Sequence, residues 1–180
     1  MLLTRVLRNV AKQTNGKLKL PKVVVFDLDH TVWPFGIDSF KLVPPYHYYH
    51  GKLIDMCQQE IKTFPDIKKI FEYLHVNGVE IAAASRTQYP TGALHLLNML
   101  GFDKYINYYE IYPGQKLKHF EKIQIQSGAK YNEMVFFDDE ERNIIDISPL
   151  GVMTVYINSE TGVTMEVFEE TMKKYSESKS

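Results

Sequence analysis

A pair of aspartates follows an apolar run in the first part of the sequence. Val23 to Phe26 are four consecutive β-branched or aromatic residues, and Asp27 and Asp29 come directly after them. Such a run predicts a buried parallel strand, whose carboxyl end is where ligands bind in open α/β sheets. Because successive residues of a strand alternate between its faces, we expect the two carboxylates to point the same way.

Two neighbouring carboxylates repel each other unless a cation lies between them or one of them keeps its proton. Both conditions suit a metal-dependent reaction in which one of the two carboxylates is the nucleophile and the other the acid and base. The alternative is that the aspartates only shape a turn after the strand, a position where Asp is common. The pair alone leaves both interpretations open.

Two further segments end in residues that could bind phosphate. Ser85 and Arg86 follow the apolar residues Ala82 to Ala84, and a serine hydroxyl there can donate to a phosphate oxygen together with the next backbone N–H groups. Lys116 lies in the first turn of an expected helix, where a cation is unfavourable without a nearby anion. Taken singly, a turn serine and a solvated lysine are the commoner roles.

A second pair of carboxylates, Asp138 and Asp139, closes another apolar run. It suggests Mg²⁺, which takes few protein carboxylates and keeps several water molecules. The alternative is capping of a helix that begins at Glu140. The functional interpretation is favoured because two carboxylate pairs, a hydroxyl and a lysine all follow strands of one expected sheet.

Strand and helix patterns alternate along most of the chain. The strand patterns cover 23–29, 79–85, 106–112, 134–139 and 152–158, and the helical patterns cover 65–76, 91–100, 115–126 and 140–148. Repeated βα units require right-handed crossovers and a sheet covered on both faces. The sequence therefore predicts an α/β fold with a doubly wound, Rossmann-like, mostly parallel five-stranded sheet.

The remaining segments define the expected domain organisation. Residues 1–20 form a basic arm without acidic residues, 21–172 form the catalytic domain, and 173–180 read as a polar, fraying tail. Within the domain, 33–64 is rich in proline, glycine and aromatic residues and is expected to lie over the first carboxylate pair as a flap. It is too short for a large cap domain. The alternative is a surface loop held down by its own aromatic residues.

Composition excludes several classes of protein. The 21 Lys and Arg residues nearly balance 22 Asp and Glu residues, which argues against nucleic acid as a partner. A single cysteine excludes an intrachain disulfide, and no apolar run is long enough to span a membrane. We expect a cytoplasmic monomer that acts on a small molecule or a phosphoprotein. The basic N-terminal residues leave a mitochondrial presequence as the alternative location.

The chain resembles the haloacid dehalogenase superfamily of phosphohydrolases. Four motifs carry the resemblance: Val-Phe-Asp-Leu-Asp-His-Thr-Val-Trp-Pro-Phe, Ala-Ala-Ala-Ser-Arg-Thr, Glu-Ile-Tyr-Pro-Gly-Gln-Lys and Phe-Phe-Asp-Asp-Glu-Glu-Arg-Asn-Ile. The similarity extends from about Pro21 to about Ile157. It implies Mg²⁺-dependent hydrolysis of phosphomonoesters through an aspartyl-phosphate intermediate.

The same resemblance implies a role for each motif residue. Asp27 would be the nucleophile and Asp29 the acid and base. Phosphate would be held by Ser85, Arg86 and Lys116. The ligands of Mg²⁺ would be Asp27, the backbone carbonyl of Asp29, and Asp139, with Asp138 in support.

The resemblance further suggests phosphotyrosine-type substrates and sugar or fructosamine phosphates. The family's Trp-Pro-Phe is typically followed by a second tryptophan, whereas this chain has Gly36, so substrate preference does not carry over with the motif. A dehalogenase, a phosphotransferase and a retired phosphatase that only binds phosphorylated ligands are the alternatives. The intact set of Asp27, Asp29, Lys116 and Asp139 argues against the last of these.

Overall fold

The computed structural model describes residues 18–38 and 42–179. Five parallel strands form its main sheet, in the order β5-β4-β1-β6-β7. Their bounds are β1 (Val23–Phe26), β4 (Glu80–Ser85), β5 (Ile106–Ile111), β6 (Met134–Asp138) and β7 (Met153–Tyr156). The predicted α/β fold with a five-stranded parallel sheet is confirmed.

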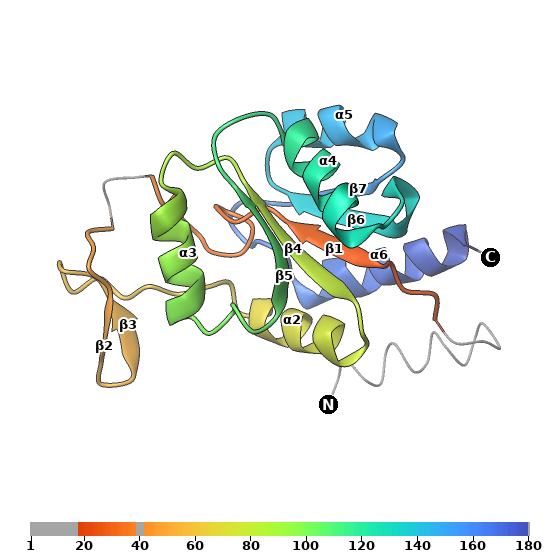
Figure 1. Cartoon of the computed structure of the whole chain (residues 1–180). Coiled ribbons are helices and arrows are strands. Elements are labelled where there is room, and N and C mark those ends of the chain that lie inside the picture. Colours follow the sequence, from red (N-terminus) through yellow and green to blue (C-terminus); the bar gives the residue numbers. More distant parts are fainter. Residues whose placement is uncertain (1–17, 39–41, 180) are drawn as a thin grey trace.

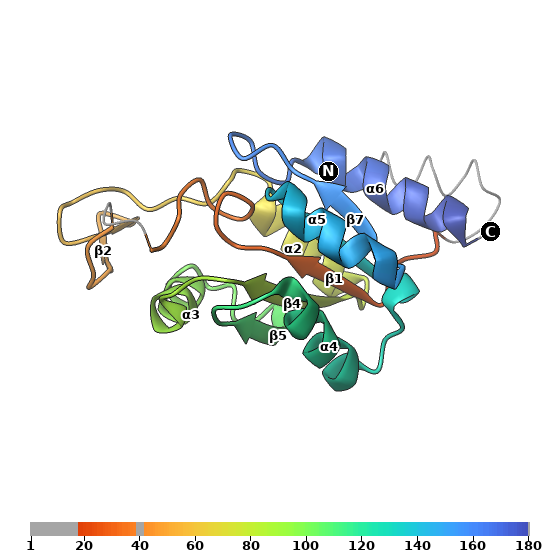
Figure 2. The same ribbon diagram turned by 90° about the horizontal axis from the view of Figure 1, so that it is seen from above.

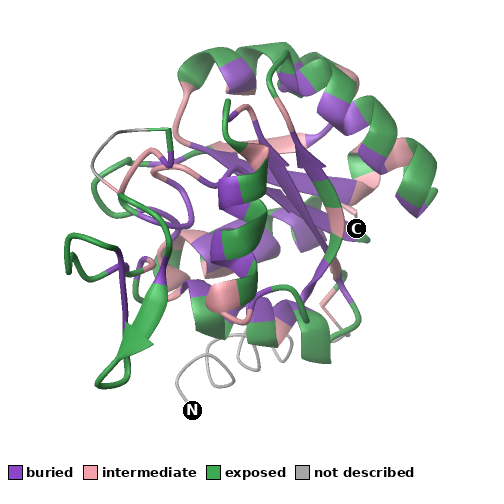
Figure 3. Cartoon of the chain, turned by 60° about the vertical axis from the view of Figure 1, so that its left-hand side comes forward, coloured by how far each residue is buried: buried purple, intermediate pink, exposed green. Residues whose placement is uncertain are grey.

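Helices cover both faces of this sheet (Figure 1). They are α2 (Ile67–Val76), α3 (Pro90–Met99), α4 (Lys116–Ser127), α5 (Glu141–Ile147) and α6 (Met165–Ser178). Alternate residues of β1 enter separate cores: Val24 and Phe26 pack with side chains of α2, α3 and α6, and Val23 and Val25 pack with those of α4 and α5. The central strands are therefore buried on both sides (Figure 3).

The sheet changes its direction of winding at β1. From β1 the chain builds outward through β4 to β5, and it then returns to the other side of β1 for β6 and β7. The carboxyl ends of β1, β4 and β6 consequently border the switch point, where open α/β sheets bind their ligands. Asp27, Ser85 and Asp138 lie at these three strand ends.

The segment 33–64 contains an antiparallel hairpin of β2 (His47–Tyr49) and β3 (Lys52–Ile54), which its sequence pattern did not predict. The hairpin lies beside α3 (Figure 2), where the Tyr48 hydroxyl donates to the Met99 carbonyl at 2.6 Å. Among the described residues of this segment, only Asp38 lines the pocket beside the carboxylates. Of the described part of the expected flap, only a residue near its start therefore contacts the pocket.

The expectation of a frayed tail over 173–180 is wrong. Helix α6 continues to Ser178 and buries Tyr175, because Phe168, Met172 and Tyr175 continue one apolar face at helical spacing. Of the basic arm at 1–20, residues 1–17 lie outside the described part of the chain. Within the described ranges, no helix has the length and apolar composition needed to cross a bilayer.

Candidate active site

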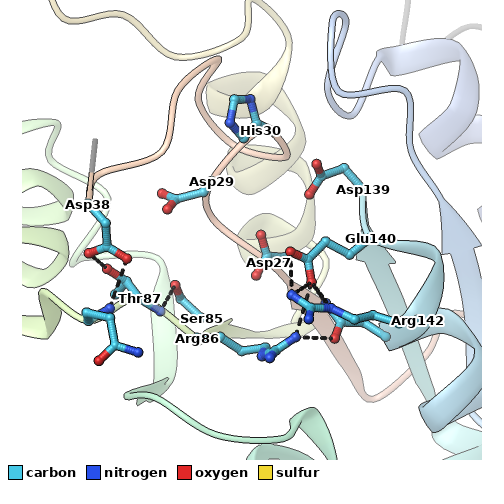
Figure 4. A pocket seen from close by; sticks show the side chains of 12 residues that line it. Asp27, Asp29, His30, Asp38, Ser85, Arg86, Thr87, Asp139, Glu140 and Arg142 are labelled. Carbon is cyan, nitrogen blue, oxygen red and sulfur yellow. Dashed lines mark hydrogen bonds and ion pairs between the residues drawn. The ribbon is translucent and has the colours of Figure 1, made fainter. Parts of the chain in front are cut away.

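The first two aspartates lie in a turn after β1 rather than on the strand itself. Strand β1 ends at Phe26, and the Asp27 backbone N–H adds one further bond to the Phe137 carbonyl at 3.0 Å. The chain then turns through His30, whose φ is +56°. The orientation of the Asp29 side chain therefore does not come from the alternation of side chains along a strand. Asp27 and Asp29 nevertheless line the same pocket (Figure 4).

The side chain of Asp29 is held in one orientation. The Trp33 indole N–H donates to its Oδ1 at 2.7 Å, and the Ile37 backbone N–H donates to its Oδ2 at 3.1 Å. Burial raises the pKa of Asp29, and these two donors act against that rise because they stabilise the carboxylate. Asp29 is thus a carboxyl group that is fixed in direction and keeps its proton to a higher pH than an exposed aspartate does.

Lys116 lies beneath the pocket, at the first residue of α4. Its side chain is fully buried, and its ammonium donates to Asp27 and to the Ala84 carbonyl. It also lies 3.3 Å from Asp138 Oδ2. Burial alone would lower the pKa of Lys116, but the charges of Asp27 and Asp138 raise it above its ordinary value. Burial raises the pKa of Asp27 well above its ordinary value, and Lys116 partly opposes this.

The adjacent residues Asp138 and Asp139 have different surroundings. Asp138 is fully buried and accepts from the Glu140 backbone N–H at 2.7 Å and from the Asn143 amide at 3.0 and 2.9 Å. Asp139 is half-buried and lines the pocket. Burial raises the pKa of Asp139. Asp138 is therefore a partner of Lys116, and Asp139 is available to a ligand.

Ser85, the last residue of β4, and Arg86, which follows it, were both expected to hold phosphate, and they also differ. Ser85 lines the pocket, and its Oγ accepts from the Thr87 backbone N–H at 3.3 Å. The Arg86 guanidinium reaches towards α5: its Nε donates to the Gly114 carbonyl at 2.8 Å and its Nη1 to Glu140 at 3.2 Å. Its Nη1 also donates to Asn143 Oδ1 at 3.3 Å. Arg86 therefore joins the loops around the pocket through Nε and Nη1, and it lines the pocket as well.

Several pocket residues were not singled out from the sequence. Asp38 accepts from the Thr87 hydroxyl at 2.5 Å and from the Gln88 backbone N–H at 2.9 Å, so it links the segment after β1 to the loop after β4. His30 and Arg142 lie at other parts of the rim (Figure 4). No local pattern indicates Asp38, because its partners Thr87 and Gln88 lie 49 and 50 positions away in the sequence.

The oxygen ligands of the pocket fit a magnesium ion. Among the described residues, no three His, Cys, Asp or Glu side chains cluster closely enough to form a metal site by themselves. Mg²⁺ does not need such a cluster, since it is usually bound by one or two carboxylates and completes its shell with water and substrate oxygens. Asp27 and Asp139 both face the pocket and can provide these carboxylates.

The fold and this site together define a class of protein. A carboxylate backed by a buried lysine, a second aspartate and a serine meet at the switch point of a doubly wound sheet. This is the arrangement of a haloacid dehalogenase-like phosphohydrolase.

Comparison with known proteins gives the family. The model of the acid phosphatase family matches residues 19–178, so the chain belongs to this family and is a phosphatase. Human magnesium-dependent phosphatase 1 is 37% identical over 163 residues, which are 90% of this chain and 91% of the human protein. A HAD-like hydrolase superfamily protein of Schizosaccharomyces pombe is 39% identical over 146 residues, 75% of this chain and 84% of the relative.

Solved structures share the fold. A HAD-superfamily hydrolase from Ehrlichia chaffeensis has a TM-score of 0.63 at 8% identity, covering 88% of this chain and 99% of its own. The N-terminal, phosphatase-containing part of a Bacteroides fragilis protein, solved as a complex with Mg, has a TM-score of 0.61 at 18% identity. That match covers 91% of this chain and 42% of the bacterial one.

Proposed function

We propose that this phosphatase hydrolyses phosphomonoesters with Mg²⁺ as cofactor and forms an aspartyl-phosphate on Asp27. The observation that carries the proposal is the position of Asp27, whose carboxylate lines the pocket while Lys116 binds it from the buried side. The name of the human relative, a magnesium-dependent phosphatase, supports the choice of cofactor.

The first half-reaction transfers the phosphoryl group to Asp27. The incoming phosphate is an anion that approaches an anionic nucleophile, so the site must supply positive charge and donors. Ser85 Oγ lines the pocket and can donate to a phosphate oxygen, and Lys116 offsets charge from beneath. Asp27, Asp139 and the backbone carbonyl of Asp29 would hold Mg²⁺, which would supply positive charge beside the phosphoryl oxygens.

Asp29 moves the protons. In its protonated form it donates to the leaving oxygen of the substrate, and as a carboxylate it then takes a proton from the water that attacks the phosphorylated Asp27. Burial raises the pKa of Asp29, which makes its protonated form easier to reach than that of an exposed aspartate. The bonds from Trp33 and Ile37 fix the direction of the carboxyl group in both steps.

For the substrate, we propose phosphotyrosine-type esters and sugar or fructosamine phosphates. Gly36 lies beside the acid, since a Cβ at this position would be in ordinary van der Waals contact with Asp29 Oδ2 at 3.8 Å and His30 Nε2 at 3.9 Å. On the rim, Asp38 and Gln88 can bind the hydroxyl or amino groups of a sugar.

The experiment compares the wild type with Asp27→Asn, using para-nitrophenyl phosphate, phosphotyrosine and sugar phosphates in the presence of Mg²⁺. The variant keeps the shape of the side chain but has no competent nucleophile, so we expect hydrolysis to be lost with every ester. Rapid acid quench followed by mass spectrometry should find phosphate on Asp27 of the wild type. Turnover of Asp27→Asn near that of the wild type would rule out the covalent mechanism, and phosphate recovered on an added sugar would indicate a phosphotransferase.

A further inference from the structure

A buried histidine joins the structural elements around the phosphate-binding end of the pocket. His119 lies on α4 and is fully buried. Its Nε2 is 3.1 Å from the Ser85 carbonyl oxygen and 3.0 Å from that of Tyr112, while its Nδ1 is 3.0 Å from the Gln115 carbonyl oxygen. The ring stacks on Tyr112, with centroids 4.2 Å apart and an interplanar angle of 8°.

All three partners are carbonyl groups, so only the histidine can donate. Burial and the nearby charge of Lys116 lower the pKa of His119, which favours a ring with a single proton. Two carbonyls face Nε2 and one faces Nδ1, so the network assigns this proton to Nε2. A second proton would gain a bond to Gln115 but would place another buried cation beside Lys116.

These contacts connect β4 to α4 at two successive peptide groups. The Ala84 carbonyl accepts from Lys116, and the Ser85 carbonyl accepts from His119. Lys116 and His119 are three residues apart and therefore lie on the same face of the helix. The Ser85 carbonyl also accepts from the Tyr112 backbone N–H at 3.0 Å, which brings the end of β5 into the same network.

We infer that His119 is a positioning residue for the phosphate site: its Nε2–H bonds fix the end of β4 against α4 and so set Ser85 relative to Lys116. His119 touches neither the pocket nor Asp27 and takes no part in the chemistry. The inference rests on the proposed function, since it assigns a purpose to the relative placement of two phosphate-binding groups. A purely structural role would affect stability alone, without changing the phosphate affinity of the folded protein.

The test uses two substitutions that differ in where they place a donor. A glutamine amide nitrogen can reach the position of histidine Nε2, whereas an asparagine amide nitrogen reaches only that of Nδ1. We expect His119→Asn to lower kcat/KM with para-nitrophenyl phosphate by about 10- to 100-fold, because misplaced binding groups have effects of this size. His119→Gln should recover most of that loss.

Three measurements separate positioning from packing. Calorimetric titration with inorganic phosphate in the presence of Mg²⁺ should show weaker binding by His119→Asn, while titration with Mg²⁺ alone should show unchanged affinity. Ile123→Ala is the matched control: Ile123 is buried on the same helix one turn further from the site, so it should lower Tm without changing kcat/KM. If His119→Asn does not fold, His119→Met, which fills the space without a donor, replaces it.

Wild-type phosphate affinity in folded His119→Asn, or equal losses in the asparagine and glutamine variants, would overturn the inference. Failure of the proposed function has a different signature, because it would appear as absence of phosphomonoester turnover by the wild type. The phosphate titration tests His119 in that case as well.

Discussion

Replacing Lys116 with methionine separates the structural role of this residue from its role in the site. Methionine has a similar length and no charge, so it fills the space but leaves Asp27 and Asp138 without their shared cation. Asp27 lies at the pocket wall and can still be neutralised from solvent or by a cation. Asp138 has no exposed surface, so the cost of an unpaired buried charge falls mainly there.

The expected magnitude follows from this burial. Removal of one partner from a buried ion pair costs about 3–5 kcal/mol. Asp138 keeps its bonds from Glu140 and Asn143, which places the loss towards the lower end of that range. In a chain of 180 residues, each kcal/mol lowers Tm by roughly 2–4 °C, so we expect a decrease of roughly 6–15 °C.

The assay is thermal unfolding of Lys116→Met, Asp138→Asn and the double variant, with kcat measured for each. The double variant no longer buries an unpaired carboxylate at position 138, so it should be more stable than Lys116→Met, and the two substitutions should be strongly non-additive. Activity should stay low in both variants that lack the lysine. A Tm for Lys116→Met within 2 °C of the wild type, or simple additivity, would refute the assignment of Lys116 as the shared counter-ion.

Two further predictions concern the other aspartates. Asp29→Asn should slow dephosphorylation with every substrate, and it should slow phosphorylation of Asp27 much more with sugar phosphates than with aryl esters, which need little protonation. Acid quench should then trap phosphate on Asp27 with an aryl ester, whereas equal rate losses for both ester types and no trapped phosphate would remove Asp29 from the acid and base role. Asp139→Ala should weaken Mg²⁺ binding in a calorimetric titration far more than Lys116→Met does, and equal losses would contradict the division between metal and phosphate ligands.

The sheet could be predicted because its strands are continuous apolar runs that differ clearly from their surroundings. All five strand patterns match observed strands to within a few residues, and the four helical patterns match α2 to α5. The hairpin of β2 and β3 was missed because its exposed residues lack an alternating pattern, and its position depends on contacts with α3. Helix α6 was missed because charged and polar residues separate its apolar residues, although these recur at helical spacing.

The site was predictable at the level of strand ends and not at the level of individual side chains. Parallel strands bring their carboxyl ends to one edge, so Asp27, Ser85 and Asp138 had to lie close together. The sequence could not show that Arg86 would bind Glu140, because that contact joins residues 54 positions apart. His119 gave no sequence signal, since a histidine inside a helix has no local feature that reveals three carbonyl partners.

The arrangement of charge explains why the pocket needs a cation from outside the chain. Lys116 carries one positive charge and is shared by two carboxylates, Asp27 and Asp138, so the buried part of the site has a formal excess of one negative charge. Asp29 and Asp139 add carboxyl groups on the pocket side. A phosphate dianion that approaches this surface is repelled until a divalent cation offsets the carboxylates. The need for a metal that supplies this charge should hold for any phosphomonoester, whatever the leaving group.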